Sequence, residues 1–234
     1  HVINVMLMEW FMVINIITLG PKLRVKQMNK LKVRNKMHQY TISKGKMIGN
    51  FEGLYKDFKD PFLQTQKEKF ETSKKVIINY CEMIKDKQKK TIKTLEIGCG
   101  FGKVSNDLAK LKFKSFGTDI SNTAIIEARK RGTAKFYQSC FLNEKLYNKI
   151  NPDILILSEV SWYVLPKLKK FIKYIKKNYK NKYLIHTLAI YHPGKQKYGK
   201  KYFTNLKEIL DFFNMKYIEY GEKWTKEEGR TFFL

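Results

Sequence analysis

The chain has 234 residues, of which 43% are hydrophobic, and this is enough to bury the core of one domain. Its cysteines (Cys81, Cys99 and Cys140) lack paired spacing and a nearby histidine cluster, which excludes a disulfide framework or a metal site and is typical of a cytoplasmic protein. The formal net charge is +26, but only five of the 47 basic residues are arginines, the side chain that phosphate and base recognition favours. The lysine excess therefore indicates an AT-rich compositional bias, and nucleic acid is not the expected partner.

The first 20 residues are largely apolar but are interrupted by Glu9, and no basic segment precedes them as in a secretory signal. A basic run follows at 21–36. A membrane partner is not expected, except through residues 1–20, whose length alone would allow a span. Since Met47 offers a plausible fresh start, we divide the chain into an untypical or poorly ordered extension (1–46) and a folded domain (47–234).

Helical and strand-like patterns alternate through the second part of the chain. Helical spacing of apolar residues predicts helices over 64–86, 105–111, 121–132, 165–177 and 205–213. Short apolar runs predict strands over 92–98, 114–120, 134–140, 152–160 and 182–190, and an antiparallel closing pair over 215–222 and 230–234. This alternation predicts an α/β fold, a Rossmann-like doubly wound and mostly parallel seven-stranded sheet with an antiparallel C-terminal strand pair.

Three alternating glycines follow the first strand of this pattern, in "TLEIGCGFGKVSNDLAK". The spacing is E-x-G-x-G-x-G, formed by Glu96, Gly98, Gly100 and Gly102. Glycine permits a tight turn and lets a ligand approach the backbone, and the helix that follows presents N–H groups to an anionic group. Strand-to-helix turns at this edge are where open α/β sheets bind ligands.

Two other glycine loops are excluded by their spacing. A phosphate loop needs Ser or Thr after Gly-Lys, but Val104 follows Lys103, and the dinucleotide fingerprint needs a third glycine where Lys103 stands. Asp119 ends the next strand, 17 residues after Gly102. A carboxylate there accepts hydrogen bonds from two ribose hydroxyls, which predicts a nucleoside-containing ligand.

"LEIGCGFG" and "GTDIS" resemble the first and second motifs of the class I S-adenosylmethionine (SAM)-dependent methyltransferases, and the resemblance covers residues 51–234. It implies SAM as cofactor, with Glu96 and the 98–102 loop, including Cys99, at its methionine end. Asp119 would hold the ribose, and Ile120 would pack on the adenine. The family often has an acidic residue after the third strand. This chain has Ser139, Cys140 and Phe141 there, so that Phe141 would stack on the adenine and Cys140 would adjoin it.

The acceptor side follows the fourth strand in "PDILILSEVSWYVLP", where residues 158–163 face the predicted crevice, with Ser158 assigned to the cofactor. The Asn/Asp-Pro-Pro-aromatic tetrad of nucleic-acid methyltransferases is missing, and so is the second loop glutamate of protein arginine methyltransferases. The turn, together with "FEGLYKDFKDPF" upstream, resembles the small-molecule and saccharide group that includes the nodulation-factor N-methyltransferases, with Phe62 replacing a tryptophan. This second resemblance implies a sugar amine or hydroxyl as acceptor.

The candidate general bases are Glu159 and His186, with His192 as a weaker third, although a carboxylate can also bind the acceptor or cap a helix, and a strand histidine can belong to the core. The residues expected to contact the acceptor are Tyr55, Trp162, Tyr163 and His192. The function predicted is methyl transfer from SAM to a nitrogen or oxygen of a small molecule or saccharide. Two alternatives stay open: an RNA or protein methyltransferase that uses the lysine surface, and a non-catalytic SAM-binding protein.

Overall fold

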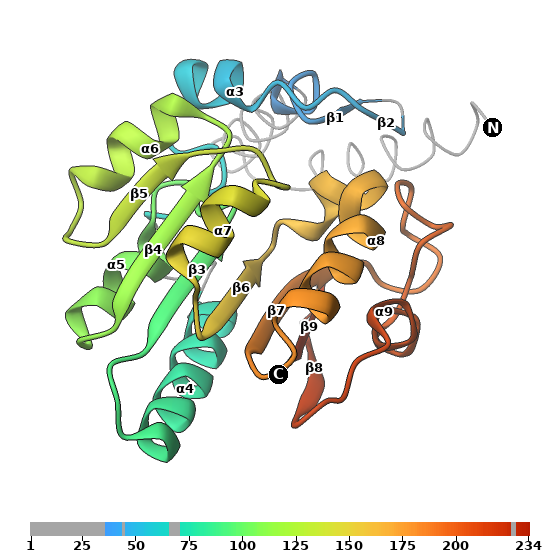
Figure 1. Ribbon diagram of the computed structural model, residues 1–234. Helices are drawn as coiled ribbons and strands as arrows, with labels where there is room; N and C mark the ends of the chain where they lie inside the picture. The colour runs from blue at the N-terminus through green and yellow to red at the C-terminus, as the bar shows by residue number, and fades with distance from the viewer. Residues whose placement is uncertain (1–35, 44, 66–70, 226–227) are drawn as a thin grey trace, which may run out of the picture.

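The computed structural model describes residues 36–43, 45–65, 71–225 and 228–234 (Figure 1). Most of the expected N-terminal extension lies outside these ranges. Among the described residues, β1 (Ile42–Ser43) pairs antiparallel with β2 (Lys46–Met47), so the expected boundary at residue 46 falls within β2. No helix in the described ranges is both long and apolar enough to cross a membrane.

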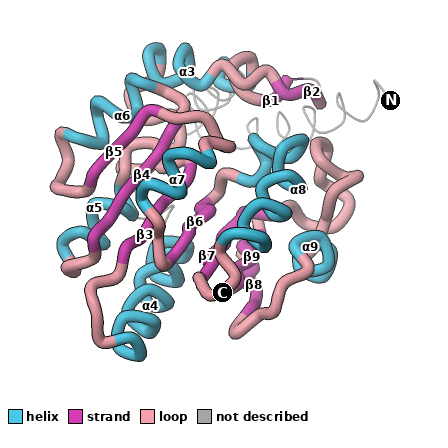
Figure 2. The backbone as a smooth tube through the Cα atoms, in the orientation of Figure 1, coloured by secondary structure: helices cyan, strands magenta, loops and turns pink. Residues whose placement is uncertain are grey.

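A seven-stranded sheet forms the centre of the molecule, in the order β5-β4-β3-β6-β7-β9-β8 (Figure 2). The strands are β3 (Lys93–Ile97), β4 (Lys114–Asp119), β5 (Lys135–Gln138), β6 (Ile154–Ser158), β7 (Tyr183–Ile190), β8 (Tyr220–Trp224) and β9 (Gly229–Phe233). The strands from β3 to β7 pair in parallel, and β9 is antiparallel to both β7 and β8. The predicted fold class is confirmed.

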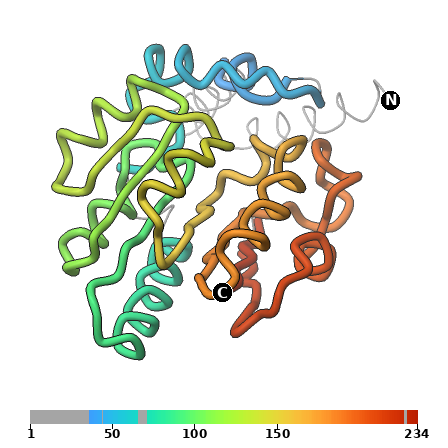
Figure 3. Tube along the Cα trace, viewed as in Figure 1, coloured from blue at the N-terminus to red at the C-terminus, as the bar shows by residue number. Residues whose placement is uncertain are grey.

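The chain path has one reversal that matters for binding. From β3 it proceeds outward to β4 and β5, and then returns to the other side of β3 to form β6 and β7 (Figure 3). The carboxyl ends of β3 and β6 therefore border a crevice at the point where the strand order reverses. Open α/β sheets bind their ligands at such a point.

Helices cover both faces of the sheet: α4 (Glu71–Gln88), α5 (Lys103–Lys110) and α6 (Asn122–Arg129) on one side, and α7 (Glu144–Ile150), α8 (Ser161–Asn178) and α9 (Leu206–Phe213) on the other. Alternation along β6 explains the two layers. Leu155 and Leu157 join the core beneath α8, whereas Ile154 and Ile156 join the core beneath α4.

Two short helices were not predicted, α7 and α3 (Phe51–Asp57). Each has an asparagine cap: the Asn50 side chain accepts from the Gly53 N–H, and Asn143 accepts from the Leu146 N–H. Other boundaries moved. α4 is described from residue 71, and residues 66–70 of the helix predicted over 64–86 lie outside the described ranges. α8 begins four residues earlier than predicted, and β8 lies at 220–224 rather than 215–222. Short or capped elements carry too little apolar periodicity to be located from sequence.

Candidate functional site

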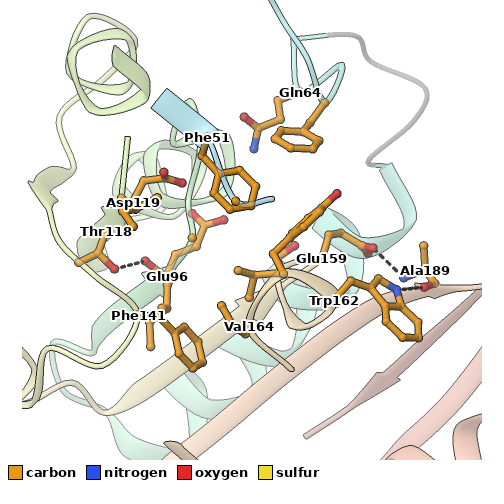
Figure 4. A pocket seen from close by; sticks show the side chains of 18 of the residues that line it. Phe51, Gln64, Glu96, Thr118, Asp119, Phe141, Glu159, Trp162, Val164 and Ala189 are labelled. Carbon is orange, nitrogen blue, oxygen red and sulfur yellow. Dashed lines mark hydrogen bonds between the residues drawn. The ribbon is translucent and has the colours of Figure 1, made fainter. Parts of the chain in front are cut away.

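A cavity of about 550 Å³ lies at the carboxyl ends of β3, β4, β6 and β7 (Figure 4). Residues from each strand end line it, including Gly98, Asp119, Ser158 and Ile190. Its volume is in the range of about 300–1,000 Å³ that small-molecule sites occupy. The crevice predicted from the strand order and the glycine motif is thus one continuous cavity.

The glycine loop (98–102) has backbone angles and close contacts that only glycine can accommodate. Gly98, Gly100 and Gly102 all have positive φ, between 51° and 76°. A Cβ on Gly98 would lie 2.5 Å from a methyl group of Val160, and one on Gly102 would lie 2.4 Å from the Phe136 ring. Both the backbone angles and the close packing therefore require glycine. Gly102 packs the helix against the sheet and does not line the cavity.

Glu96 lines the cavity and anchors the helix behind the loop. Its Oε2 accepts from the Ser105 N–H at 3.0 Å and from the Ser105 hydroxyl at 2.6 Å. Its side chain is buried. Burial, opposed by the Ser105 hydrogen bonds, raises the pKa of Glu96 to about 7. At neutral pH this carboxyl is therefore about half ionised, and a cation bound beside it would lower its pKa and favour the ionised form.

Asp119 lines the cavity at the tip of β4, and its carboxylate is held by the backbone on two sides. Oδ2 accepts from the Gly100 N–H and Oδ1 from the Ser121 N–H, each at 2.9 Å. Burial raises the pKa of Asp119, and these backbone hydrogen bonds oppose it. Each oxygen retains acceptor capacity on the cavity side, since an ionised carboxylate offers about four lone-pair positions. The geometry fits a diol such as that of a ribose.

Gln64 clasps the glycine loop, although no pattern in the sequence pointed to it. Its Nε2 donates to the Cys99 carbonyl at 3.3 Å, and its Oε1 accepts from the Phe101 N–H at 2.8 Å. A Cβ on Gly100 would lie 2.3 Å from the same Oε1 and 2.6 Å from the hydroxyl of Tyr55. Gln64 and Tyr55 both line the cavity and cover Gly100 there, whereas Cys99 and Gly100 do not line it.

Glu52 on α3 is a second residue that sequence reasoning missed. Its carboxylate accepts from the Ser121 hydroxyl at 2.7 Å and from the hydroxyl and N–H of Thr123 at the start of α6. Burial acts against the charge, but these hydrogen bonds lower the pKa of Glu52 to about 2. The contact fixes α3 over α6, and this places Phe51 of α3 on the cavity wall.

The edge beyond Asp119 is open. Ile120 is 52% exposed and lines the cavity together with Cys140, Phe141 and Ser158. The ring of Phe141 is braced by Phe171 beneath it, with centroids 4.9 Å apart. An exposed aliphatic side chain and a braced aromatic ring can hold a flat heterocycle between them.

Aromatic side chains line the other half of the cavity. The Tyr163 ring lies between those of Phe51 and Phe62, with centroid separations of 5.2 and 5.8 Å. Burial, then the charges of Tyr191 and Glu159, raise the pKa of Tyr163, so its phenol stays protonated at neutral pH. The Trp162 Nε1 donates to the Ala189 carbonyl at 2.7 Å. Tyr163 and Trp162 thus present one phenol and several ring faces to a bound molecule.

Glu159 lines the cavity, but its oxygens are already bound. Its Oε2 accepts from the Ala189 N–H at 2.7 Å (Figure 4), and its Oε1 accepts from the Ser73 hydroxyl at 2.7 Å. The Arg230 guanidinium pairs with Oε1 at 2.8 Å. Its backbone has a positive φ of 59°, which is uncommon for a non-glycine residue. Glu159 therefore joins β6, β7, β9 and α4 around the cavity.

The two histidine candidates do not line the cavity. His186 is fully buried, its ring stacks on Phe233, and its Nε2 lies 2.9 Å from the Ser161 hydroxyl. Burial lowers the pKa of His186 to about 3. His192 packs on Trp224, with ring centroids 5.0 Å apart. The expectation that His186 faces an acceptor is corrected: it lies in the middle of β7, below the strand end that borders the cavity.

No group of three or more His, Cys, Asp or Glu side chains is placed to hold a metal ion within the described ranges. The carboxylates of the cavity are instead bound to backbone N–H groups, hydroxyls and one arginine.

The strand order, the antiparallel final pair and an acidic residue at the tip of β4 define a class I methyltransferase fold. Residues 95–182 match the protein family described as "Methyltransferase domain". The matched residues thus agree with the predicted resemblance to the methyltransferases. No curated protein matches the sequence.

Two solved structures that align with the chain are both methyltransferases by name. The bifunctional kinase-methyltransferase WbdD aligns with a TM-score of 0.57 and 15% identity over 75% of this chain and 41% of its own. Magnesium protoporphyrin IX methyltransferase from Synechocystis PCC 6803, solved with bound SAM, aligns with a TM-score of 0.48 and 16% identity over 92% and 97% of the two chains. This chain thus spans about two fifths of the length of WbdD, and the likeness to WbdD concerns the fold.

Proposed function

We propose that this protein is an enzyme that transfers the methyl group of SAM to a nitrogen or oxygen atom of a small molecule or saccharide. The observation that carries the proposal is the Asp119 carboxylate, which two backbone N–H groups hold at the rim of a cavity of about 550 Å³. That cavity continues from Asp119 to an aromatic wall. A nucleoside cofactor and an acceptor would therefore lie in one enclosed space.

On the cofactor side, each residue has a role that follows from its contacts. Asp119 would accept hydrogen bonds from both ribose hydroxyls, while Ile120 and Phe141 would enclose the adenine. The Glu96 carboxyl would pair with the amino group of the methionine part, and this cation would shift its pKa back toward the ordinary range. SAM itself supplies a methyl group that is already electrophilic. The chain's main contribution is therefore to hold the acceptor in line.

On the acceptor side, Tyr163 and Trp162 would position the nucleophile. The Tyr163 phenol can donate a hydrogen bond to an oxygen or nitrogen acceptor, and the ring faces of Phe51 and Trp162 suit the apolar face of a sugar. The three donors on Glu159 leave one lone-pair position, on Oε2, at which it could accept a proton. Its proposed role is therefore to fix the acceptor wall, and Glu159→Gln tests whether it also acts as a base.

Calorimetric titration of the full chain with SAM and with S-adenosylhomocysteine (SAH) tests the cofactor side. A screen of methyl transfer from radiolabelled SAM to sugar nucleotides and amines then tests the acceptor side. We expect saturable one-to-one binding of both nucleosides and labelled product from at least one acceptor class. If Glu159→Gln retains full turnover with an acceptor found in this way, Glu159 is not the base.

A second candidate is a non-catalytic SAM-binding protein. The observations that favour it are the three donors that already contact Glu159 and the full burial of His186 away from the cavity wall. Cofactor binding without turnover across sugars, amines, RNA and basic peptides would support this candidate. Turnover on RNA or on peptides would instead identify the macromolecular alternative.

A further inference from the structure

Lysines form the outward face of α8 from residue 167 to residue 177. Between residues 167 and 177, every exposed position is a lysine, and the intervening residues, such as Leu168 and Phe171, are buried in the core. The six exposed lysines are Lys167, Lys169, Lys170, Lys173, Lys176 and Lys177. The helix contains no aspartate or glutamate. We call these six residues the α8 lysine face.

A matched helix shows that this is not the overall lysine bias of the chain. α4 has the same length of 18 residues, but it contains four lysines and three acidic residues, Glu71, Glu82 and Asp86. Lys74 and Lys75 of α4 both pair with Glu71, at 2.8 and 3.6 Å. A compositional bias acting alone would leave the two helices alike. The charge is instead concentrated where α8 faces solvent.

The six lysines of the α8 lysine face form no ion pair within the described ranges. Lys169 lies over the Phe212 ring and Lys176 donates to the Asn214 carbonyl, but neither contact neutralises charge. The acids of neighbouring α9 are already engaged, since Asp211 pairs with Lys207 and Glu208 accepts from Thr204. The charge of these six lysines is therefore not paired with an acidic side chain, and Glu144 on α7 is an acidic neighbour that also forms no ion pair with them.

Adjoining segments widen the face. Tyr174 of α8 donates to Asn148 of α7 at 2.6 Å, and α7 exposes Lys145 and Lys149. Gly199, in the loop that joins β7 to α9, packs against Trp162 and Leu165 at the start of α8. That loop exposes four more lysines, Lys195, Lys197, Lys200 and Lys201. The positive surface therefore extends across three segments and is two-dimensional, not a single row.

We propose that the α8 lysine face docks the protein on an anionic membrane surface. A broad, flat array of ammonium groups suits a sheet of acidic lipid headgroups, whereas nucleic-acid recognition favours arginine and interleaved aromatic side chains, which this face lacks. The apolar residues 1–20 and the basic run at 21–36 give the same chain a second membrane-compatible segment in sequence. This proposal does not depend on methyl transfer.

Docking would also orient the cavity. Lys167 belongs to the α8 lysine face and lines the cavity as well. The cavity mouth would therefore lie close to the membrane surface. On the proposed function, an acceptor presented at that surface would reach the site without crossing bulk water.

Co-sedimentation of the full chain with vesicles tests the proposal. The vesicles are pure phosphatidylcholine, or phosphatidylcholine with about 30% phosphatidylglycerol. The test variant is Lys170→Gln/Lys173→Gln/Lys177→Gln, and the matched control Lys87→Gln/Lys135→Gln/Lys223→Gln removes the same charge from exposed positions on α4, β5 and β8. All variants keep residues 1–20, so differences report on α8. Circular dichroism verifies that each variant is folded.

We expect binding to the anionic vesicles only, and its loss at about 0.5 M salt because of charge screening. Each lysine near an anionic surface contributes about fivefold in affinity. The α8 variant, which loses three lysines, should therefore bind about 100-fold more weakly than the wild type, and the control at most about threefold more weakly. Equal losses in both variants, or no binding to anionic vesicles, would overturn the proposal. So would tighter binding to poly-uridine than to vesicles, since the face would then serve nucleic acid.

Discussion

Replacing Asp119 with asparagine separates its charge from its shape. The substituted side chain would keep one oxygen for a backbone N–H, but its amide nitrogen would face the second backbone donor, from Gly100 or Ser121. One ribose hydroxyl would then donate to the neutral amide oxygen, and the other would accept from the amide NH2 group, so that each would exchange a hydrogen bond to a charged group for a neutral one. Hydrogen bonds to charged groups contribute about 1.5–3 kcal/mol and neutral ones about 0.5–1.5, a difference of about 1–1.5 per hydroxyl. Two hydroxyls give about 2–3 kcal/mol, or roughly 30- to 150-fold in affinity.

Calorimetry with SAH measures this loss directly. Asp86→Asn is the matched control, because Asp86 is exposed on α4, away from the cavity, and the charge change is identical. Thermal unfolding of both variants verifies that the fold is intact. Unchanged SAH affinity in a folded Asp119→Asn variant would refute the assignment of the ribose to this carboxylate. An equal loss in the Asp86 control would show that the effect is one of net charge.

Three further predictions test other parts of the site. Burial raises the pKa of Glu96 to about 7, so the folded state holds the proton of this carboxyl more tightly than the unfolded state does. The free energy of unfolding that Glu96 contributes is therefore fully present below about pH 4.5 and is lost as pH rises through 7. Glu96→Gln should remove this pH dependence, and at pH 8 its free energy of unfolding should exceed that of the wild type by about 1–3 kcal/mol. If thermal unfolding of the two proteins shows the same pH dependence, the burial argument is wrong. Cys140 is exposed and lines the cavity, while Cys81 and Cys99 are buried. A maleimide should therefore label Cys140 first, and bound SAH should slow the labelling. An unchanged labelling rate would show that SAH binds elsewhere. Gln64→Leu removes two hydrogen bonds to the glycine loop, of about 1 kcal/mol each. Hydrogen exchange in the peptide that contains this loop should therefore accelerate, and SAH should bind about tenfold more weakly. Unchanged exchange would show that the loop does not depend on Gln64.

The sequence was sufficient for the fold and for the class of the domain because both depend on local patterns. Strand periodicity, the E-x-G-x-G-x-G spacing and Asp119 at a strand end are all short-range signals, and parallel strands place their carboxyl ends at one edge. Asp119 therefore lies beside the glycine loop, as expected. The glycine loop also shows a limit, since Gly100 is covered by Gln64 and Gly102 serves helix packing.

The residues that sequence reasoning missed or misplaced depend on contacts between distant segments. Gln64 reaches a loop about 35 residues further along the chain, and Glu52 caps a helix about 70 residues away. No local pattern indicates either contact. His186 had a usable signal, because it lies four residues before the end of β7, and a residue that far below a strand end is in the core. Glu159 lies at the right place, but its three donors come from β7, β9 and α4.

A crystal structure of the full chain with SAH is the most direct test of the central claim, that the β3–β4 edge of this cavity holds a nucleoside cofactor. We expect both ribose hydroxyls within about 3 Å of the Asp119 carboxylate, the adenine between Ile120 and Phe141, and the sulfur directed toward Tyr163. SAH bound at another surface, or a cavity that stays empty at saturating SAH while the fold is unchanged, would contradict the claim.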